Sequence, residues 1–180
     1  MRSQEIPPHE IAGERIQQLI ALMKKTLSAT PDGIGLAAPQ VAEPLRIFLV
    51  SEEAEAIDRG EISRHEHPAK EQDESEKHLP EEQPHRTGKQ YVFINPAVRK
   101  ASRKKIEEPE GCLSVPRVFG LVQRHEKITV AAYDETGKPF IRGATRLFAR
   151  VIQHELDHLN GILFIDRATD ILRHEHRRKK

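Results

Sequence analysis

The chain has 180 residues, of which 32% are charged and 4% aromatic, and its formal net charge at pH 7 is +1. This length suits a single domain with one hydrophobic core, and the near-zero charge gives no argument for nucleic-acid or membrane binding by the chain as a whole. No apolar run is long enough to span a bilayer, and the polar first ten residues do not form a signal-peptide pattern.

The first part of the chain predicts a helix, a loop and a strand. Residues 8–29 place apolar side chains at helical spacing, with Gln, Lys and Arg between them, and so predict an amphipathic helix. A turn at residues 30–33 ends this helix. The loop Gly33-Ile34-Gly35-Leu36-Ala37-Ala38-Pro39-Gln40, rich in small residues, follows, and the apolar residues 45–50 predict a strand.

Residues 51–90 differ sharply in composition from the rest of the chain. Glu, Asp, Lys, His, Gln and Pro dominate this segment, and large apolar side chains are almost absent. A segment of this kind cannot bury enough apolar surface to order itself well. We therefore expect a charged, flexible insertion. Residues 51–62 could form a short solvated helix, and the histidines of the segment are interpreted as part of a solvated loop rather than a metal site.

The remaining residues predict several strands and a second long helix. Strands are expected at residues 91–95, 121–122, 127–133 and 139–142. Pro96 stops the first of them, and a turn at residues 134–137 joins the last two into a hairpin. Residues 144–159 predict a helix that ends at an Asn-Gly pair, and a C-terminal helix beginning near Asp166 would lead into a basic tail at 173–180. The fold class is therefore α+β, with small antiparallel or mixed sheets around a central helix and a helix near each terminus.

The predicted central helix contains the motif His154-Glu155-Leu156-Asp157-His158. Two histidines four residues apart leave a helix on the same face and can bind one ion. Glu155 lies one step round the helix and can reach a water on that ion without being a ligand. Apolar residues such as Leu147 and Val151 flank the motif and predict a buried helix, on which unpaired His and Glu side chains would be costly. A metal site is thus favoured over an exposed polar face.

Cys112 is the candidate for a third ligand, because a catalytic divalent site needs three protein ligands and one open position. It lies in the segment Glu110-Gly111-Cys112-Leu113-Ser114, where Gly111 allows close approach of the chain. A thiolate is a strong ligand for zinc or ferrous iron. Core packing is the alternative for a lone cysteine, but the polar neighbours favour ligation. One cysteine allows no internal disulfide, which suits the reducing cytoplasm.

Three segments in order resemble the three-motif signature of the peptide deformylase family. They are the loop Gly33-Ile34-Gly35-Leu36-Ala37-Ala38-Pro39-Gln40, then Glu110-Gly111-Cys112-Leu113-Ser114, then Gln153-His154-Glu155-Leu156-Asp157-His158. The resemblance implies a single catalytic domain and a metal-dependent amide hydrolase that removes the N-formyl group from the formyl-methionine of newly made proteins. The expected mechanism is attack by a metal-bound hydroxide, with Glu155 as general base and then acid.

The resemblance also implies roles for individual residues. The metal ligands would be Cys112, His154 and His158, holding Fe(II) in vivo, although the donor set also accepts Zn(II), Ni(II) or Co(II). The side-chain amide of Gln40 and the backbone N–H of Leu113 would donate to the developing oxyanion.

Further roles concern the substrate and the cysteine loop. Gly35, with Ile34 nearby, would contact the formyl-methionine end. A buried Glu110–Arg124 pair would hold the cysteine loop. Leu147 and Val151 offer an apolar slot for the methionine side chain, while Arg150 on the same helix makes the rim of that slot uncertain.

The implied partners are N-formylmethionyl nascent peptides, and the basic tail at 173–180 could contact ribosomal RNA on charge grounds. We expect a cytoplasmic protein with no membrane contact and no sequence-specific nucleic-acid binding. Two other readings stay open. A metalloprotease would take its third ligand from His174, Glu175 or His176, and a ribosome-bound deformylase-like protein without turnover is disfavoured by the intact Glu155.

Overall fold

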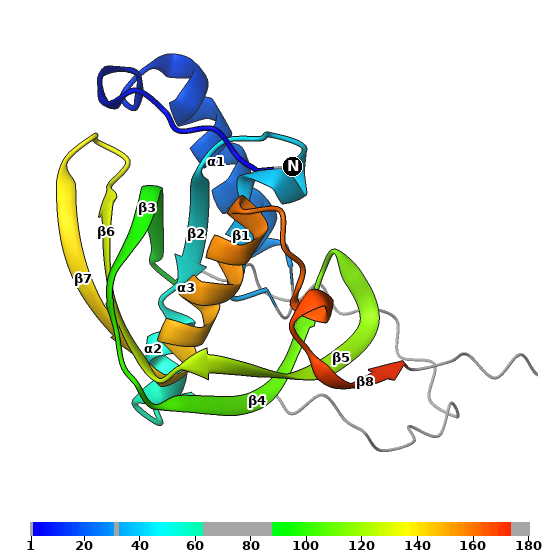
Figure 1. Cartoon of the computed structure of the whole chain (residues 1–180). Coiled ribbons are helices and arrows are strands. Elements are labelled where there is room, and N and C mark those ends of the chain that lie inside the picture. Colours follow the sequence, from blue (N-terminus) through cyan, green and yellow to red (C-terminus); the bar gives the residue numbers. More distant parts are fainter. Residues whose placement is uncertain (1, 31–32, 63–87, 174–180) are drawn as a thin grey trace, which may run out of the picture.

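The computed structural model describes residues 2–30, 33–62 and 88–173 and contains two antiparallel sheets around a central helix (Figure 1). The five-stranded sheet has the order β1-β2-β3-β6-β7 and consists of β1 (Gly35–Ala37), β2 (Ile47–Ser51), β3 (Gln90–Ala101), β6 (Lys127–Tyr133) and β7 (Pro139–Thr145). The three-stranded sheet has the order β4-β5-β8 and consists of β4 (Lys105–Cys112), β5 (Val115–His125) and β8 (Thr169–Arg173). The α-helices are α1 (Glu14–Ser28), α2 (Glu53–Asp58) and α3 (Arg146–Leu159), and the short 3-10 helices are η1 (Pro8–Glu10), η2 (Ala38–Val41) and η3 (Phe164–Asp166). The central helix α3 contacts strands of both sheets, which confirms the α+β class.

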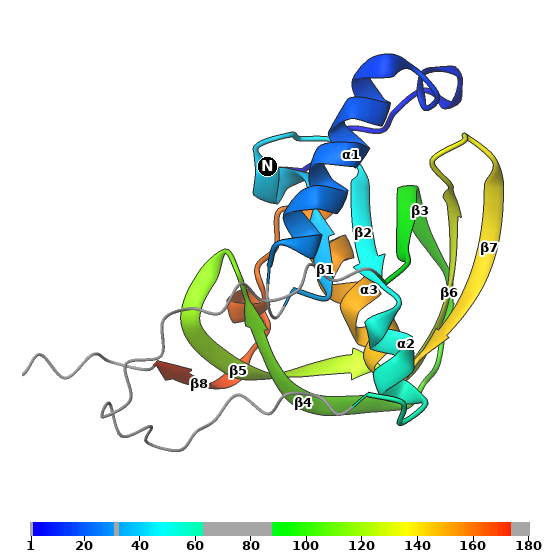
Figure 2. The same cartoon turned by 180° about the vertical axis from the view of Figure 1, so that it is seen from behind.

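A helix covers each face of the five-stranded sheet (Figures 1 and 2). Alternate residues of β2 belong to two apolar clusters: Phe48 and Val50 lie in the cluster with α3, and Ile47 and Leu49 in the cluster with α1. This division follows from the two-residue period of a strand. The buried face of α1 has the predicted helical spacing and consists of Ile16, Leu19, Ile20, Met23 and Leu27.

The first helix is shorter than predicted, because the helical conformation is interrupted at Gly13. Gly13 has an extended conformation (φ −70°, ψ 151°) and separates η1 from α1. Helix α1 therefore begins at Glu14 rather than at residue 8.

The short helix expected at the start of the insertion is present as α2, but it is packed rather than solvated. Ala54 and Ala56 are buried, at 0% and 7% exposure. The carboxylate of Asp58 accepts hydrogen bonds from the backbone N–H groups of Leu147 (3.0 Å) and Phe148 (3.1 Å) at the first turn of α3. Because those N–H groups have no partner within the helix, Asp58 caps α3 from outside.

Replacement of Asp58 by Ala is expected to lower the free energy of unfolding by about 1–2 kcal/mol, because two N–H groups at the start of α3 lose their acceptor. Urea denaturation followed by circular dichroism measures this loss. Asn keeps one of the two acceptor oxygens and replaces the other by an NH2 donor, so Asp58→Asn should recover only part of the difference. Equal stability of Asp58→Ala and the parent chain would contradict the capping role.

The prediction that a strand ends at Pro96 is wrong, because β3 continues to Ala101. The pairing of β3 with β6 shifts register between Ile94 and Ala97, and Asn95 adopts a left-handed φ of 49°. A proline is tolerated in such a bulge, where the ladder of hydrogen bonds is already interrupted.

The side chain of Asn95 binds the N-terminal segment. It accepts from the backbone N–H of Ile6 (2.9 Å) and donates to the carbonyl oxygen of Ile6 (2.7 Å). The bulge in β3 therefore also anchors the residues before η1.

The predicted C-terminal helix is wrong for Thr169–Arg173, which form strand β8. This strand pairs antiparallel with the edge of β5 that β4 leaves open. The backbone N–H and C=O groups at this edge of β5 gain partners in β8. The local sequence pattern around residue 169 contains no information on this distant edge. The basic residues 174–180, with the expected ribosomal contact, and residues 63–87 of the expected insertion lie outside the described residues.

Candidate metal centre and active-site pocket

The structure brings Cys112, His154 and His158 together, although the cysteine lies on β4 and the histidines on α3. One ligand atom from each residue lies within 4.8 Å of the others, and Sγ of Cys112 is 3.2 Å from Nε2 of His158. Metal–sulfur and metal–nitrogen bonds are about 2.0–2.3 Å long, so donors this close can share one ion. One thiolate and two imidazoles are a donor set that divalent transition metals accept.

The end of β4 delivers Cys112 to α3 through a local irregularity. Gly111 pairs with Phe119 of β5 and Cys112 with Val115, so the register shifts between these two steps. A Cβ atom at Gly111 would lie 2.8 Å from the ring of Phe119. Only glycine fits this close approach, which supports the sequence argument about Gly111.

Glu155 is buried between α3 and β1, at 3% exposure. Its Oε2 atom has no hydrogen-bond partner among the described residues, and burial raises the pKa of Glu155 to about 7. A Cβ atom at Gly35 would collide with Oε1 of Glu155 and lie 2.8 Å from Cγ1 of Val151. The backbone of β1 therefore packs directly on this carboxylate, and a glycine is required there.

Gln40 reaches the same site from η2. Its Oε1 accepts a hydrogen bond from the backbone N–H of Ala37 (2.8 Å), and its Nε2 lies 3.0 Å from Oγ of Ser114 and 3.7 Å from Sγ of Cys112. The bond to Ala37 fixes the orientation of the amide, so that the NH2 group points toward the donor cluster. The sequence reasoning gave no role to Ser114, although the residue stands in the second motif.

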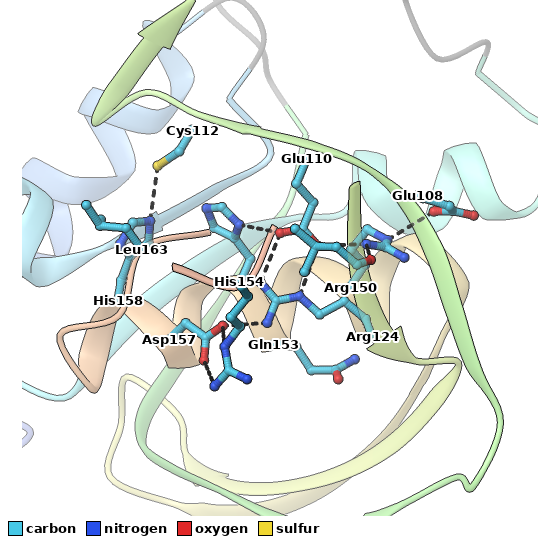
Figure 3. Close-up of polar contacts among 12 residues, drawn as sticks. Glu108, Glu110, Cys112, Arg124, Arg150, Gln153, His154, Asp157, His158 and Leu163 are labelled. Carbon is cyan, nitrogen blue, oxygen red and sulfur yellow. Dashed lines mark hydrogen bonds and ion pairs between the residues drawn. The ribbon is translucent and has the colours of Figure 1, made fainter. Parts of the chain in front are cut away.

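Glu110 is the centre of a buried ion network beside the donors (Figure 3). Arg124 donates to both carboxylate oxygens at 2.9 Å, which forms the pair that the resemblance implied. Nδ1 of His154 lies 3.0 Å from Oε2 of Glu110. When the ring is neutral and Nδ1 donates to this carboxylate, Nε2 has a lone pair for an ion. Burial by itself raises the pKa of Glu110, but hydrogen bonds from His154 and Arg124 lower it to about 2.

The donor side chains shift one another's pKa values. Burial raises the pKa of Cys112, but hydrogen bonds with His154 and His158 bring it down to about 5. Burial lowers the pKa of His154, but hydrogen bonds with Cys112 and Glu110 raise it to about 10. Each shift favours the charged form of one partner because the opposite charge lies beside it. The lowered pKa of Cys112 favours the thiolate, the form that binds metals.

A pocket beside the donor cluster opens to solvent. Its lining includes the predicted substrate and oxyanion residues Ile34, Gly35, Gln40, Leu113, Leu147 and Val151, together with Cys112, His154 and Glu155. Arg124 and His158 lie outside this lining. The pocket has an apolar wall from α3 and a polar floor at the donors, a combination typical of small-molecule sites.

Two buried charges on α3 have contacts that the sequence did not reveal. Arg150 and Asp157 are 4% and 6% exposed. Asp157 pairs with Arg124 and Arg167, and Arg150 pairs with Glu110. The sequence did contain one indication of these ion pairs: both charges lie on a helix that was predicted to be buried, and buried charges need partners.

Known proteins resemble this chain over most of its length. The sequence profile of a family described as Polypeptide deformylase matches residues 1–174. Peptide deformylase 1A, chloroplastic/mitochondrial, of Arabidopsis thaliana is 36% identical over 166 residues, which cover 92% of this chain but 56% of the relative. Peptide deformylase of Chloroflexus aurantiacus is 36% identical over 165 residues, covering 91% of this chain and 78% of the relative. The chain therefore spans little more than half of the plant relative.

Solved structures agree with this similarity. The plant peptide deformylase PDF1B superimposes with a TM-score of 0.70 at 32% identity, covering 94% of this chain and 74% of that chain. A peptide deformylase from Synechococcus elongatus in complex with actinonin gives a TM-score of 0.67 at 32% identity, covering 94% and 72%.

Proposed function

Because the chain belongs to the polypeptide deformylase family, we propose that it is a metal-dependent amide hydrolase that removes the formyl group from N-terminal formyl-methionine. The observation that carries this proposal is the buried Glu155 carboxylate, which has one oxygen without a partner among the described residues and lies beside three converging donors. A buried polar atom without a partner is costly, and such a cost is typical of a functional site.

Cys112, His154 and His158 would hold the metal ion. A divalent ion there would supply Lewis acidity and a water acidic enough to lose a proton near neutral pH. Fe(II) stays the expected ion, and Zn(II), Ni(II) and Co(II) are alternatives with the same donor set.

Glu155 is the proposed proton carrier. It accepts the proton of the attacking water and passes it to the amine that leaves. Negative charge develops on the formyl oxygen, and the NH2 group of Gln40 and the backbone N–H of Leu113 donate to it. The hydrogen bond from Ala37 to Gln40 holds this donor in place before the substrate arrives.

The pocket wall on α3 is proposed to receive the methionine side chain. Leu147 and Val151 are buried apolar residues of this wall, and Ile34 faces it from the loop before β1. The guanidinium of Arg150 is engaged with acceptors on β4 and β5. These contacts neutralise and saturate the guanidinium of Arg150, which supports an apolar slot beside it.

The test is hydrolysis of a formyl-methionyl tripeptide by metal-loaded protein, with the same peptide bearing an N-acetyl group and an unformylated peptide with an internal bond as comparisons. Release of formate from the first substrate alone supports the proposal. Cleavage of the internal bond would instead support the metalloprotease reading, whose candidate ligands at 174–176 lie outside the described residues. No turnover of any substrate would refute both enzyme readings.

Replacement of Gln40 by Met is expected to lower kcat by about 10²–10³-fold, because an oxyanion donor is lost while the size of the side chain is kept. Steady-state kinetics with the formyl-methionyl tripeptide measure this effect. Ser114→Ala serves as the control. It removes the hydroxyl that contacts the Gln40 amide and should change kcat much less. A kcat for Gln40→Met close to that of the parent chain would argue against the oxyanion role.

The compartment and the partners also stay proposals. Within the residues that the structure describes, no helix is long and apolar enough to cross a membrane. The cytoplasmic location expected from the sequence is untested, and the plant relative named above carries the words chloroplastic/mitochondrial in its name. Formyl-methionyl nascent chains are the proposed substrates, and a single catalytic domain is the proposed organisation.

A further inference from the structure

Arg150 makes more polar contacts than its position on the pocket wall requires (Figure 3). Its Nε lies 3.0 Å from Oε2 of Glu108. Nη1 donates to Oε1 of Glu110 (2.7 Å) and to the carbonyl oxygen of Val122 (2.9 Å), and Nη2 donates to the carbonyl oxygen of Ile106 (2.8 Å). One side chain of α3 therefore binds three positions of β4 and one of β5.

The two carboxylate oxygens of Glu110 have different partners. Oε1 accepts from Nη1 of Arg150 and Nε of Arg124, and Oε2 accepts from Nη2 of Arg124 and faces Nδ1 of His154. Arg150 thus holds the oxygen opposite to the one that faces the histidine. Without it, Oε1 keeps a single donor, and His154 is the remaining direct contact of the carboxylate with α3.

The strand held by Arg150 also carries Cys112. Glu108 and Glu110 precede the cysteine on β4 by four and two residues, while His154 and His158 follow Arg150 on α3. A contact between this strand and this helix therefore sets the separation of the thiolate from the imidazoles. Arg suits such a site because its planar fork donates in fixed directions to several acceptors.

We propose that Arg150 is a positioning residue of the metal centre. It binds β4 and the Glu110 carboxylate to α3, which sets the placement of Cys112 against the two histidines and the orientation of the His154 ring. The structural part of this inference stands on the contacts alone, and its consequence for turnover rests on the proposed function.

The two ends of the Arg150 side chain can be tested separately. Arg150 lines the pocket, and its guanidinium makes the contacts with β4 and β5. Arg150→Met keeps an unbranched apolar chain and removes the guanidinium. Arg150→Lys keeps one cation, which cannot reach all the acceptors that the guanidinium fork binds.

The matched control is Arg142→Met. Arg142 of β7 also makes an ion pair, at 2.7 Å with Glu55, and it lies over the rings of Tyr91 and Phe148. None of these partners is a proposed ligand, so we expect loss of this pair to lower stability without moving the donors. A second control, Glu108→Gln, removes the charge at the exposed end of the Arg150 contacts and leaves the Glu110 contact in place.

The experiment compares Co(II)-loaded parent chain and variants by visible absorption, by the rate of Co(II) loss to a chelator, and by kinetics with the formyl-methionyl tripeptide. For Arg150→Met we expect altered absorption bands, metal loss faster by about 10–100-fold, and a similar fall in kcat with little change in KM. Arg150→Lys should lie between Arg150→Met and the parent chain. Arg142→Met and Glu108→Gln should keep the parental spectrum and rate of metal loss.

A parental spectrum and metal-loss rate in Arg150→Met would overturn the inference, as would an equal change in Arg142→Met. If Arg150→Met does not fold, Arg150→Lys decides: a shifted spectrum supports positioning, and an unchanged one refutes it. If the parent chain binds Co(II) but does not hydrolyse the formyl peptide, the proposed function fails while the spectra and metal-loss rates still test Arg150.

Discussion

Replacement of Glu155 by Gln is expected to lower kcat for a formyl-methionyl tripeptide by about 10²–10⁴-fold, because the amide cannot carry the proton from water to amine. The same change should leave the free energy of unfolding unchanged or raise it. The carboxylate is 3% exposed and its Oε2 has no partner among the described residues, so the folded chain bears the cost of burying it. Loss of activity with undiminished stability is typical of a residue kept for function.

Steady-state kinetics, metal analysis and thermal unfolding together check this expectation. The variant should bind metal in the same amount as the parent chain, since Glu155 is not among the proposed ligands. Glu107→Gln, the same substitution at an exposed position of β4, is the control and should change none of the three measurements. Substantial turnover by Glu155→Gln would exclude this residue as the base, and loss of metal would assign it to the ligands instead.

Replacement of Arg124 by Met should cost about 3–5 kcal/mol of unfolding free energy, the largest stability effect that we expect. Arg124 is 5% exposed, donates to both oxygens of Glu110 and pairs with Asp157. Although burial lowers the pKa of Arg124, the hydrogen bonds with Glu110 raise it above its usual value, and the residue stays charged. Its removal leaves two buried carboxylates with fewer partners, and this uncompensated charge is the source of the cost.

Chemical denaturation measures the loss, and Lys104→Met provides the comparison. Lys104 pairs with Glu126 at 2.8 Å, but its side chain is 68% exposed. Such a pair is worth less than about 1 kcal/mol, because water and salt screen it. If the two variants lost similar amounts of unfolding free energy, burial would not be the reason that the Arg124 pair stabilises the fold. Arg167 still faces Asp157 in the Arg124 variant, which accounts for an effect at the lower end of the range.

The grouping of the candidate ligands was predictable because the evidence for them is local in the sequence. The spacing of His154 and His158 requires only a helix, and α3 is the predicted helix to within a few residues of its start. Cys112 was chosen for its ligand chemistry, and the structure brings its sulfur into the same cluster.

Predictions that depended on local pattern alone failed where distant segments decided the conformation. Pro96 lies within β3 because a bulge opposite β6 accommodates a residue without an N–H group. Residues 169–173 form a strand because β5 has an open edge. Helix α2 is packed rather than solvated: Ala54 lies in the apolar cluster with α3, and Asp58 caps that helix. In each case the partner lies far away in the sequence.

The sequence by itself determined the fold class, the central helix and the candidate ligands, since side-chain chemistry and helical spacing are properties of short segments. The tertiary structure alone decided how Arg150 and Asp157 are neutralised, and why Gly35 must lack a side chain beside Glu155. These features depend on which strand meets which face of α3. That arrangement results from burial of the whole apolar core, and no short segment of the sequence specifies it.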